Sequence, residues 1–260
     1  MRQLQVVKIG TSSVFHDETI DYMVLSNLGY DLAKLRYERE TDSVLVVSGA
    51  IKLGKRKLGF KTEPISDLEN LASASMGQDE LKEHYTVGLK QGFERYAQEK
   101  GLVGLGFYLN QRLFTNYQLS ETKTRRYAVH LLDYLIAKGI VPLVNYDNAL
   151  DDIPDQSNDI LAAQIAKALI ADRFVILTDV DGLLDRDDNL ILRISYINES
   201  IKALCRDEGN GIGAMLTKLE AADLLLKECI PTIIGNTKYG LLELIENERI
   251  RTLVKNIQNH

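Results

Sequence analysis

Short runs of β-branched and other apolar residues recur at wide intervals along the chain, and such runs predict buried strands. The six runs cover residues 4–9, 43–48, 102–109, 140–145, 173–178 and 231–235. Segments between them carry apolar residues at helical spacing, as in Tyr22, Leu25, Leu28, Leu32 and Leu35. Parallel strands need long crossovers, and nearly continuous apolar strands indicate a sheet covered on both faces. The pattern therefore predicts a doubly wound α/β fold with a mainly parallel sheet and helices on both faces.

Composition narrows the class of protein further. The 260 residues are 45% hydrophobic and 26% charged, as in folded soluble domains. No linker-like stretch divides them, so we expect a single domain over residues 1–260. A formal net charge of −6 disfavours a nucleic-acid partner. No apolar run has the length of a membrane span, and the N-terminus lacks the features of a signal peptide. Two cysteines are too few for a disulfide framework. We therefore expect a cytoplasmic protein without a membrane partner.

Two common nucleotide-binding motifs are incomplete in this sequence. Gly49 is followed after four residues by Gly54 and Lys55, but Arg56 stands where a P-loop needs Ser or Thr. Gly10 follows the first strand without the second and third glycines of a dinucleotide-binding turn. These departures exclude a P-loop and disfavour NAD binding.

Polar residues gather where the predicted strands end, which is where doubly wound folds bind ligands. Gly10 and Gly49 follow the first two strands, and such turns can bind phosphate through backbone N–H groups, although either glycine could simply permit a tight turn. Lys8 lies inside an apolar strand, where a buried lysine needs a partner. We therefore expect a phosphate or a carboxylate beside it, the alternative being a side chain that reaches solvent at the end of the sheet.

Two later segments also carry candidate chemistry. The run from Gly213 to Lys218 precedes a predicted helix over residues 219–227 and suits closure over a nucleotide, the alternative being a surface loop that ends in a Thr cap. Asn158 and Asp159 open a predicted helix over residues 158–171, where they could also serve only as caps. The four histidines have no metal-ligand spacing, and we assign them no role.

Several motifs, taken in order, resemble those of the glutamate 5-kinases of the amino acid kinase superfamily, over nearly the whole chain. The motifs are Lys8-Ile9-Gly10-Thr11-Ser12, Ser48-Gly49-Ala50-Ile51, Met76-Gly77-Gln78, Thr178-Asp179-Val180-Asp181-Gly182-Leu183 and Gly213-Ala214-Met215-Leu216-Thr217-Lys218. Many members carry a C-terminal PUA domain. Because this chain ends shortly after residues 251–254, we expect the short form without that domain.

The resemblance implies transfer of the γ-phosphoryl group of ATP, with Mg²⁺, to the side-chain carboxylate of L-glutamate in the first step of proline biosynthesis. By the same resemblance, Lys8 and Lys218 would stabilise the transferring phosphoryl group and Asp159 would orient both lysines. The nucleotide would be held by the backbone N–H of Gly10 and, in the C-terminal part, by Thr178, Asp179, Gly213, Ala214, Met215 and Thr217. The acceptor would be held in the N-terminal part by Ser48, Gly49, Asn148 and Asn158. The resemblance assigns no residue to the metal, and it implies a homo-oligomer, either a dimer or a tetramer.

Three positions depart from the family pattern. Asn148 replaces an acid expected to hold the ammonium of the substrate, a role that the neighbouring Asp147 could take instead. Ser157 replaces another acid, and Ala214 replaces a glycine of the nucleotide loop. An ammonium held by neutral groups loses a charge-assisted hydrogen bond of about 1–2 kcal/mol. Two alternatives therefore stay open: a related kinase that phosphorylates another small acid or a phosphate, and a non-catalytic amino-acid sensor. Retention of Lys8, Lys218 and Asp159 disfavours the sensor, since binding alone does not need cations around a transferring group.

Overall fold

A computed structural model describes residues 2–16, 19–60, 66–148, 157–205 and 214–256 of the chain. Its main sheet has eight strands in the order β5-β6-β4-β1-β7-β9-β10-β8. These are β1 (Gln3–Ile9), β4 (Thr41–Val47), β5 (Leu109–Phe114), β6 (Val141–Tyr146), β7 (Arg173–Thr178), β8 (Arg193–Ile194), β9 (Thr232–Asn236) and β10 (Arg251–Val254). The six strands from β5 to β9 are parallel, and β10 runs antiparallel to β9. A separate hairpin joins β2 (Phe15–His16) to β3 (Thr19–Ile20).

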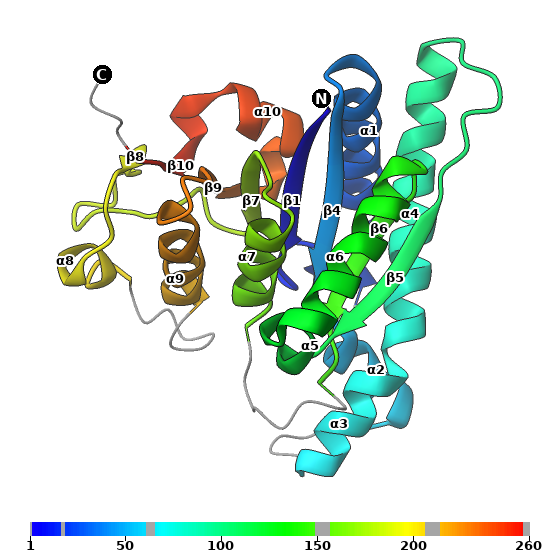
Figure 1. The fold of residues 1–260 in the computed structure, drawn as a ribbon, viewed down its shortest axis with the longest axis horizontal. Helices are drawn as coiled ribbons and strands as arrows, with labels where there is room; N and C mark the ends of the chain where they lie inside the picture. The colour runs from blue at the N-terminus through cyan, green and yellow to red at the C-terminus, as the bar shows by residue number, and fades with distance from the viewer. Residues whose placement is uncertain (1, 17–18, 61–65, 149–156, 206–213, 257–260) are drawn as a thin grey trace.

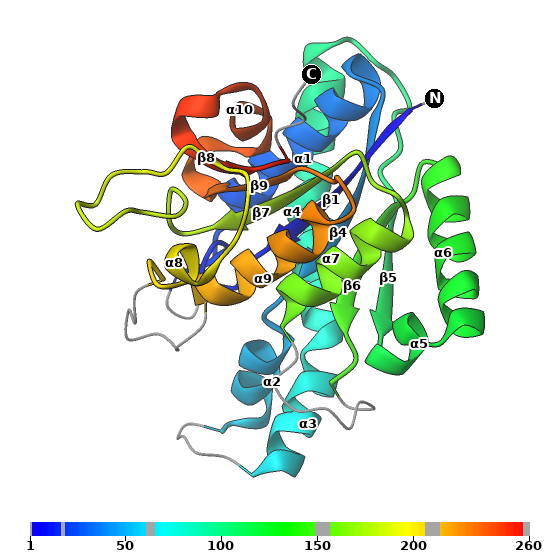
Figure 2. The same cartoon turned by 60° about the vertical axis from the view of Figure 1, so that its left-hand side comes forward.

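Helices cover both faces of this sheet, as predicted (Figures 1 and 2). One face carries α6 (Thr122–Ala137), α7 (Asn158–Ala168) and α9 (Ala214–Leu226), and the other carries α1 (Tyr22–Glu38), α4 (Gln78–Glu99) and α10 (Leu241–Glu246). Neighbouring residues of a strand point to opposite faces, so Val6 packs in the core under α7 and α9 while Val7 packs under α1 and α4. Lys8 lies two residues after Val6 and therefore points to the same face of the sheet, toward α7 and α9.

Two further helices lie beyond the carboxyl ends of the parallel strands, at the bottom of Figure 1: α2 (Ala50–Leu58) and α3 (Asp67–Met76). Glycines let them pack backbone to backbone. A Cβ on Gly54 would lie 1.8 Å from the carbonyl oxygen of Ser73, and one on Gly77 would lie 1.8 Å from that of Ala50. The remaining short helices are α5 (Asn116–Ser120), α8 (Glu199–Lys202), η1 (Thr237–Tyr239) and η2 (Glu248–Ile250).

Five of the six predicted strands are confirmed to within two residues, but the strand predicted over residues 102–109 is wrong. Gly101 and Gly104 both have left-handed backbone there, Val103 is fully exposed, and the strand begins only at Leu109. The two helices predicted at residues 158–171 and 219–227 are present, although the first ends at Ala168 and the second already begins at Ala214. None of the helices in the described part of the chain is both long and apolar enough to cross a bilayer.

Candidate active site

Two lysines from different elements meet on one carboxylate. Lys8 Nζ, near the end of β1, lies 2.8 Å from Asp159 Oδ1, and Lys218 Nζ, on α9, lies 3.7 Å from Asp159 Oδ2. Thr217 Oγ1 donates a hydrogen bond of 3.0 Å to the same Oδ2. The three charged residues are 6%, 3% and 7% exposed in the order Lys8, Asp159 and Lys218. The expected carboxylate beside Lys8 is thus confirmed, and the alternative of a solvent-reaching lysine is wrong.

The electrostatics of this cluster keep Asp159 ionised. Burial by itself would raise the pKa of Asp159, but the charges of Lys8 and Lys218 and the hydrogen bonds outweigh it and hold the pKa below its ordinary value. Burial lowers the pKa of Lys218, and the carboxylates of Asp159 and Asp179 only partly offset that effect. With both lysines charged, the cluster carries one net positive charge in a site shielded from water.

The start of α7 connects this cluster to the neighbouring strand β4. Ser157 is the N-cap and accepts the N–H of Asp159 at 3.1 Å, so the alternative that Asn158 or Asp159 serves only as the cap is wrong. Asn158 Nδ2 donates instead to Ser48 Oγ at 2.9 Å, just beyond the end of β4. Asn158 Oδ1 is buried and accepts no hydrogen bond from any described residue. Asn158 thus contacts the end of β4, while the next residue, Asp159, contacts the two lysines.

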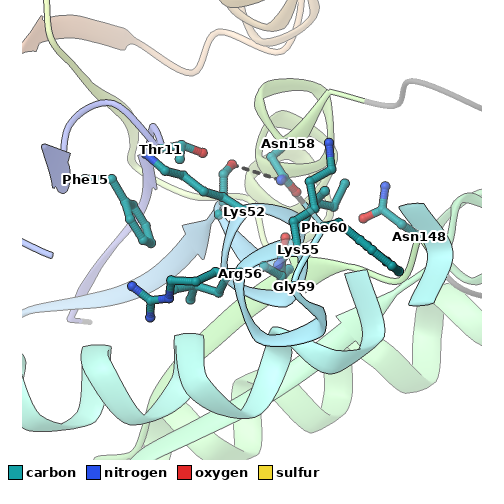
Figure 3. A pocket seen from close by; sticks show the side chains of 15 residues that line it. Thr11, Phe15, Lys52, Lys55, Arg56, Gly59, Phe60, Asn148 and Asn158 are labelled. Atoms are coloured by element: carbon teal, nitrogen blue, oxygen red, sulfur yellow. Dashed lines mark hydrogen bonds between the residues drawn. The ribbon is translucent and has the colours of Figure 1, made fainter. Parts of the chain in front are cut away.

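The four residues predicted to hold the acceptor, Ser48, Gly49, Asn148 and Asn158, all line one cavity of about 800 Å³. Figure 3 shows Asn148 and Asn158 approaching it from the side opposite Phe15. Gly49 ends the turn into α2 with a φ of +115°, and a Cβ there would lie 2.7 Å from Phe15 Cε2. The first residues of α2 also line the cavity, so the N–H groups that have no partner within the helix lie at the cavity wall.

The prediction missed part of the cavity wall. Asn145 also lines it. Lys52, Lys55 and Arg56 of α2 line it together with Phe60 (Figure 3). A spacing of three and four residues places basic side chains on one face of a helix, so positions 52, 55 and 56 did carry a signal. Arg56 also contacts Glu80 of α4, and Lys52 Nζ lies 5.4 Å from the ring centre of Phe15.

The residues predicted to hold the nucleotide occupy the ends of β7 and β1 and the start of α9. Thr178 is buried and donates to Asp179 Oδ1 at 3.1 Å, while Asp179 itself is exposed. The end of β9 is tied to the same strand end, because Asn236 Nδ2 donates to the carbonyl of Asp179 and Thr237 Oγ1, in the next residue, donates to that of Thr178. The sequence patterns did not predict this second support.

Of the other residues predicted to hold the nucleotide, Gly10, Met215 and Thr217 have contacts within the protein. The N–H of Gly10 donates to the carbonyl of Leu177 at 3.1 Å, so it could reach a phosphate only as a shared donor. Gly213 and the side chain of Ala214 lie outside the described residues. Met215 packs against the core, and Thr217 lies within α9, where it bonds Asp159. The alternative of a Thr cap at this helix start is therefore wrong.

A protein cage for a metal ion is not found among the described residues, which include no group of three carboxylate, imidazole or thiol side chains with metal-binding geometry. Asp159 already has two lysines and a hydroxyl as partners. Mg²⁺ in phosphoryl-transfer sites is commonly bound by substrate phosphates, waters and one or two carboxylates. The donor set fits a metal that arrives with a nucleotide, for which the exposed carboxylate of Asp179 is available.

Solved structures with the same fold share little sequence with this chain. Carbamate kinase from Giardia lamblia bound to AMP-PNP superposes with a TM-score of 0.63 at 13% identity, covering 98% of this chain and 99% of that one. A crystal structure of a protein from Aeropyrum pernix K1 gives a TM-score of 0.66 at 16% identity, covering 98% and 100%. At these identities the likeness establishes the fold alone.

Sequence relatives identify the family. Residues 3–236 match the model of the Amino acid kinase family. The glutamate 5-kinase of Streptococcus suis is 34% identical over 95% of this chain and 69% of its own length. The glutamate 5-kinases of Ligilactobacillus salivarius and Listeria monocytogenes are 30% and 32% identical, each over 95% of this chain and over 94% and 91% of their lengths. The chain therefore belongs to the amino acid kinase family, within its glutamate 5-kinase group.

Proposed function

We propose that this protein transfers the γ-phosphoryl group of ATP to the side-chain carboxylate of L-glutamate, giving L-glutamyl 5-phosphate, the first step of proline biosynthesis. The observation that carries the proposal is the Lys8–Asp159–Lys218 cluster, which a single turn of α7 joins to the acceptor cavity. Relatives named glutamate 5-kinase that align over nearly all of the chain support the same reaction.

The reaction joins two anions, so charge and alignment limit its rate. A carboxylate oxygen of the acceptor attacks the γ-phosphorus and forms the new O–P bond. The bond from phosphorus to the bridging oxygen breaks, and ADP leaves with that electron pair. No proton has to be removed, because the acceptor carboxylate is already ionised, so the site needs no general base. Lys8 and Lys218 offset the negative charge on the transferring group in a buried site, where fixed charges act most strongly.

Asp159 contributes by holding its two lysines in place. Each lysine contacts a different oxygen of the carboxylate, and Thr217 fixes one of those oxygens further. Without the carboxylate, two buried ammonium groups would repel each other. Asp159 is therefore a positioning residue, whereas Lys8 and Lys218 would touch the reacting phosphoryl group.

Nucleotide binding would fall to Thr178, Asp179 and the start of α9. Magnesium, when bound, neutralises phosphate charge, and the nucleotide phosphates would hold it with Asp179 as the nearby exposed carboxylate. The proposal also includes a single domain over residues 1–260, a cytoplasmic location and a homo-oligomer, either a dimer or a tetramer. Both cysteines, Cys205 and Cys229, are free thiols, which suits a reducing compartment.

The acceptor cavity supports an amino acid as substrate. Asn158 Oδ1 is a buried acceptor that lacks a described donor, and an ammonium group would satisfy it. The N–H groups at the start of α2, together with Lys52, would favour a carboxylate. Glutamate carries both kinds of group.

A second candidate is a kinase of the same family for another small acid. The specific observation in its favour is that the described residues lining the cavity include Lys52, Lys55 and Arg56 but no carboxylate, with Asn148 where the family pattern has an acid. ADP release with Mg²⁺ and ATP, measured with glutamate, aspartate, N-acetylglutamate and uridylate, separates the two. Preference for glutamate supports the first candidate, preference for another acceptor supports the second, and binding without turnover would contradict both in favour of a sensor.

A further inference from the structure

Three side-chain amides form a hydrogen-bonded chain that ends at the acceptor cavity. Gln111 on β5 donates through Nε2 to Gln78 Oε1 at 2.9 Å, and Asn145 on β6 donates through Nδ2 to the same oxygen at 3.3 Å. Gln78 opens α4 directly after Gly77 and is 8% exposed, while Asn145 is 3% exposed and lines the cavity. Gln78 belongs to the Met76-Gly77-Gln78 motif, to which the proposed reaction gives no role.

Backbone groups at both ends of this series of amides determine which atom of each amide is the oxygen and which is the nitrogen. A side-chain amide can often turn over and exchange its oxygen and nitrogen, but here each end meets a group that can only donate or only accept. The N–H of Tyr146 donates to Asn145 Oδ1 at 2.8 Å, which turns Nδ2 of Asn145 toward Gln78. At the other end, Gln111 Nε2 also donates to the carbonyl of Gln78 at 3.4 Å. Gln78 must therefore present its oxygen to two N–H donors.

We propose that Gln78 is a positioning residue of the acceptor cavity, which, supported by Gln111, holds the Asn145 amide so that an N–H faces the carboxylate of the acceptor. Nδ2 of Asn145 carries two hydrogens, and Gln78 accepts one of them. No described residue accepts the other, and the side chain lines the cavity. This inference rests on the proposed function for the identity of the acceptor, but the amide geometry does not depend on it.

Loss of the Gln78 side-chain oxygen would leave the buried Asn145 N–H without its acceptor, and the Asn145 side chain would turn to find another partner, whereas Gln111 would keep only its longer contact with the Gln78 carbonyl. The cavity would then lose a fixed donor for the acceptor, whereas the lysine cluster and the nucleotide residues would keep their contacts. We therefore expect the Michaelis constant for the acceptor to rise and that for ATP to stay unchanged. A residue needed only for stability would not separate these two constants.

The test compares Gln78→Met with Gln78→Glu, which keeps an oxygen acceptor, and with Gln111→Leu. Gln91→Met is the matched control, because Gln91 is exposed on the same helix α4. With the acid that the wild type phosphorylates fastest, Gln78→Met should raise the Michaelis constant for that acid about tenfold and change kcat and the constant for ATP less than about twofold. Gln111→Leu should give a smaller change of the same kind, and it serves as the test if Gln78→Met does not fold.

A readout that needs no turnover accompanies the kinetics. The side-chain NH₂ resonances of Asn145, assigned by their loss in Asn145→Ala, should shift in Gln78→Met and stay close to wild type in Gln78→Glu and Gln91→Met. Unchanged resonances in Gln78→Met, or an equal rise of both Michaelis constants, would overturn the inference. If the wild type phosphorylates no acid, the proposed function fails, and the resonances alone decide whether Gln78 orients Asn145.

Discussion

Lys8 Nζ lies 2.8 Å from Asp159 Oδ1, a contact that joins the central strand β1 to the first turn of α7. The residue before Asp159, Asn158, contacts Ser48 at the end of β4 and lines the acceptor cavity. One helical turn thus sets the position of the lysine cluster relative to the cavity. The fold itself therefore places the two lysines next to the acceptor cavity.

Removal of either lysine tests the phosphoryl-transfer site. Lys8→Ala and Lys218→Ala should each lower kcat by about a hundredfold or more, since each deletes a fixed charge that acts on the transferring group. Lys227→Ala is the control, because Lys227 is an exposed residue directly after the end of α9 and pairs at the surface with Asp223. Circular dichroism should show both variants folded. Turnover near wild type in a folded Lys8→Ala or Lys218→Ala protein would refute the assignment.

Replacement of the shared carboxylate should affect catalysis more than nucleotide binding. Asp159→Asn keeps the shape of the side chain but leaves two buried lysines without a counter-charge, which should reduce the free energy of unfolding by about 3 kcal/mol. The turnover number should fall at least tenfold, while the dissociation constant for ATP, measured by calorimetry, should change less. An unchanged turnover number would remove Asp159 from the site.

Deprotonation of Lys218 should reduce activity at a pH below 10.5, the ordinary pKa of lysine. Burial lowers the pKa of Lys218, so its charge is lost as pH rises through a value below 10.5. The kcat/KM for ATP, which reports the free enzyme, should decline across that range. The charged form is the one that burial disfavours, so the contribution of Lys218 to the free energy of unfolding should increase with pH between its folded pKa and 10.5. In Lys218→Arg, residual activity should keep its value to higher pH, because a guanidinium does not titrate there, and an identical alkaline limb would contradict the assignment.

Restoration of the acid at position 148 tests how the acceptor is recognised. Asn148→Asp adds a carboxylate to a cavity whose described lining has none, and it should strengthen an ammonium contact by about 1–2 kcal/mol. The Michaelis constant for glutamate should therefore fall about tenfold, and that for N-acetylglutamate, which lacks the ammonium, should not fall. Equal changes for both acids would show that position 148 does not contact the amine.

The turn into α2 should not tolerate a side chain at Gly49. Gly49→Ala would force a Cβ into a left-handed backbone and to within 2.7 Å of the Phe15 ring, with an expected loss of about 1–3 kcal/mol in the free energy of unfolding. Gly101→Ala is the control, because Gly101 also has a positive φ but no atom within 4 Å of the added Cβ. Chemical denaturation should show a larger loss for Gly49→Ala, and acceptor binding should weaken only in that variant. Equal losses would mean that the Phe15 contact is unimportant.

The sequence pattern predicted the centre of the sheet well and its edges poorly. The central strands are continuous apolar runs because helices cover both of their faces. β5 lies at an edge and has three consecutive polar residues at positions 110–112, so the apolar run before it was mistaken for the strand. β10 was missed because it begins with buried polar residues, Arg251 and Thr252. Thr252 is satisfied there by the N–H of Leu183 and the carbonyl of Ile191, partners that no local pattern reveals.

In the candidate site, too, features with a local sequence signal were predicted, and features built from distant residues were not. A lysine in an apolar strand predicts a nearby partner on physical grounds alone, and the structure supplies Asp159. The amide chain from Gln111 through Gln78 to Asn145 could not be predicted, because its members lie 33 and 67 residues apart and neutral amides leave no periodic or charge signal. The supports beneath Thr178 and Asp179 depend in the same way on distant residues, Asn236 and Thr237.

The most direct test of the central claim is the capture of the acyl phosphate itself. Purified protein with ATP, Mg²⁺ and L-glutamate, in the presence of hydroxylamine, should form γ-glutamyl hydroxamate in step with ADP, and Lys8→Ala should form almost none. ADP release without hydroxamate, or equal hydroxamate from wild type and Lys8→Ala, would contradict phosphoryl transfer to the glutamate side chain at this site.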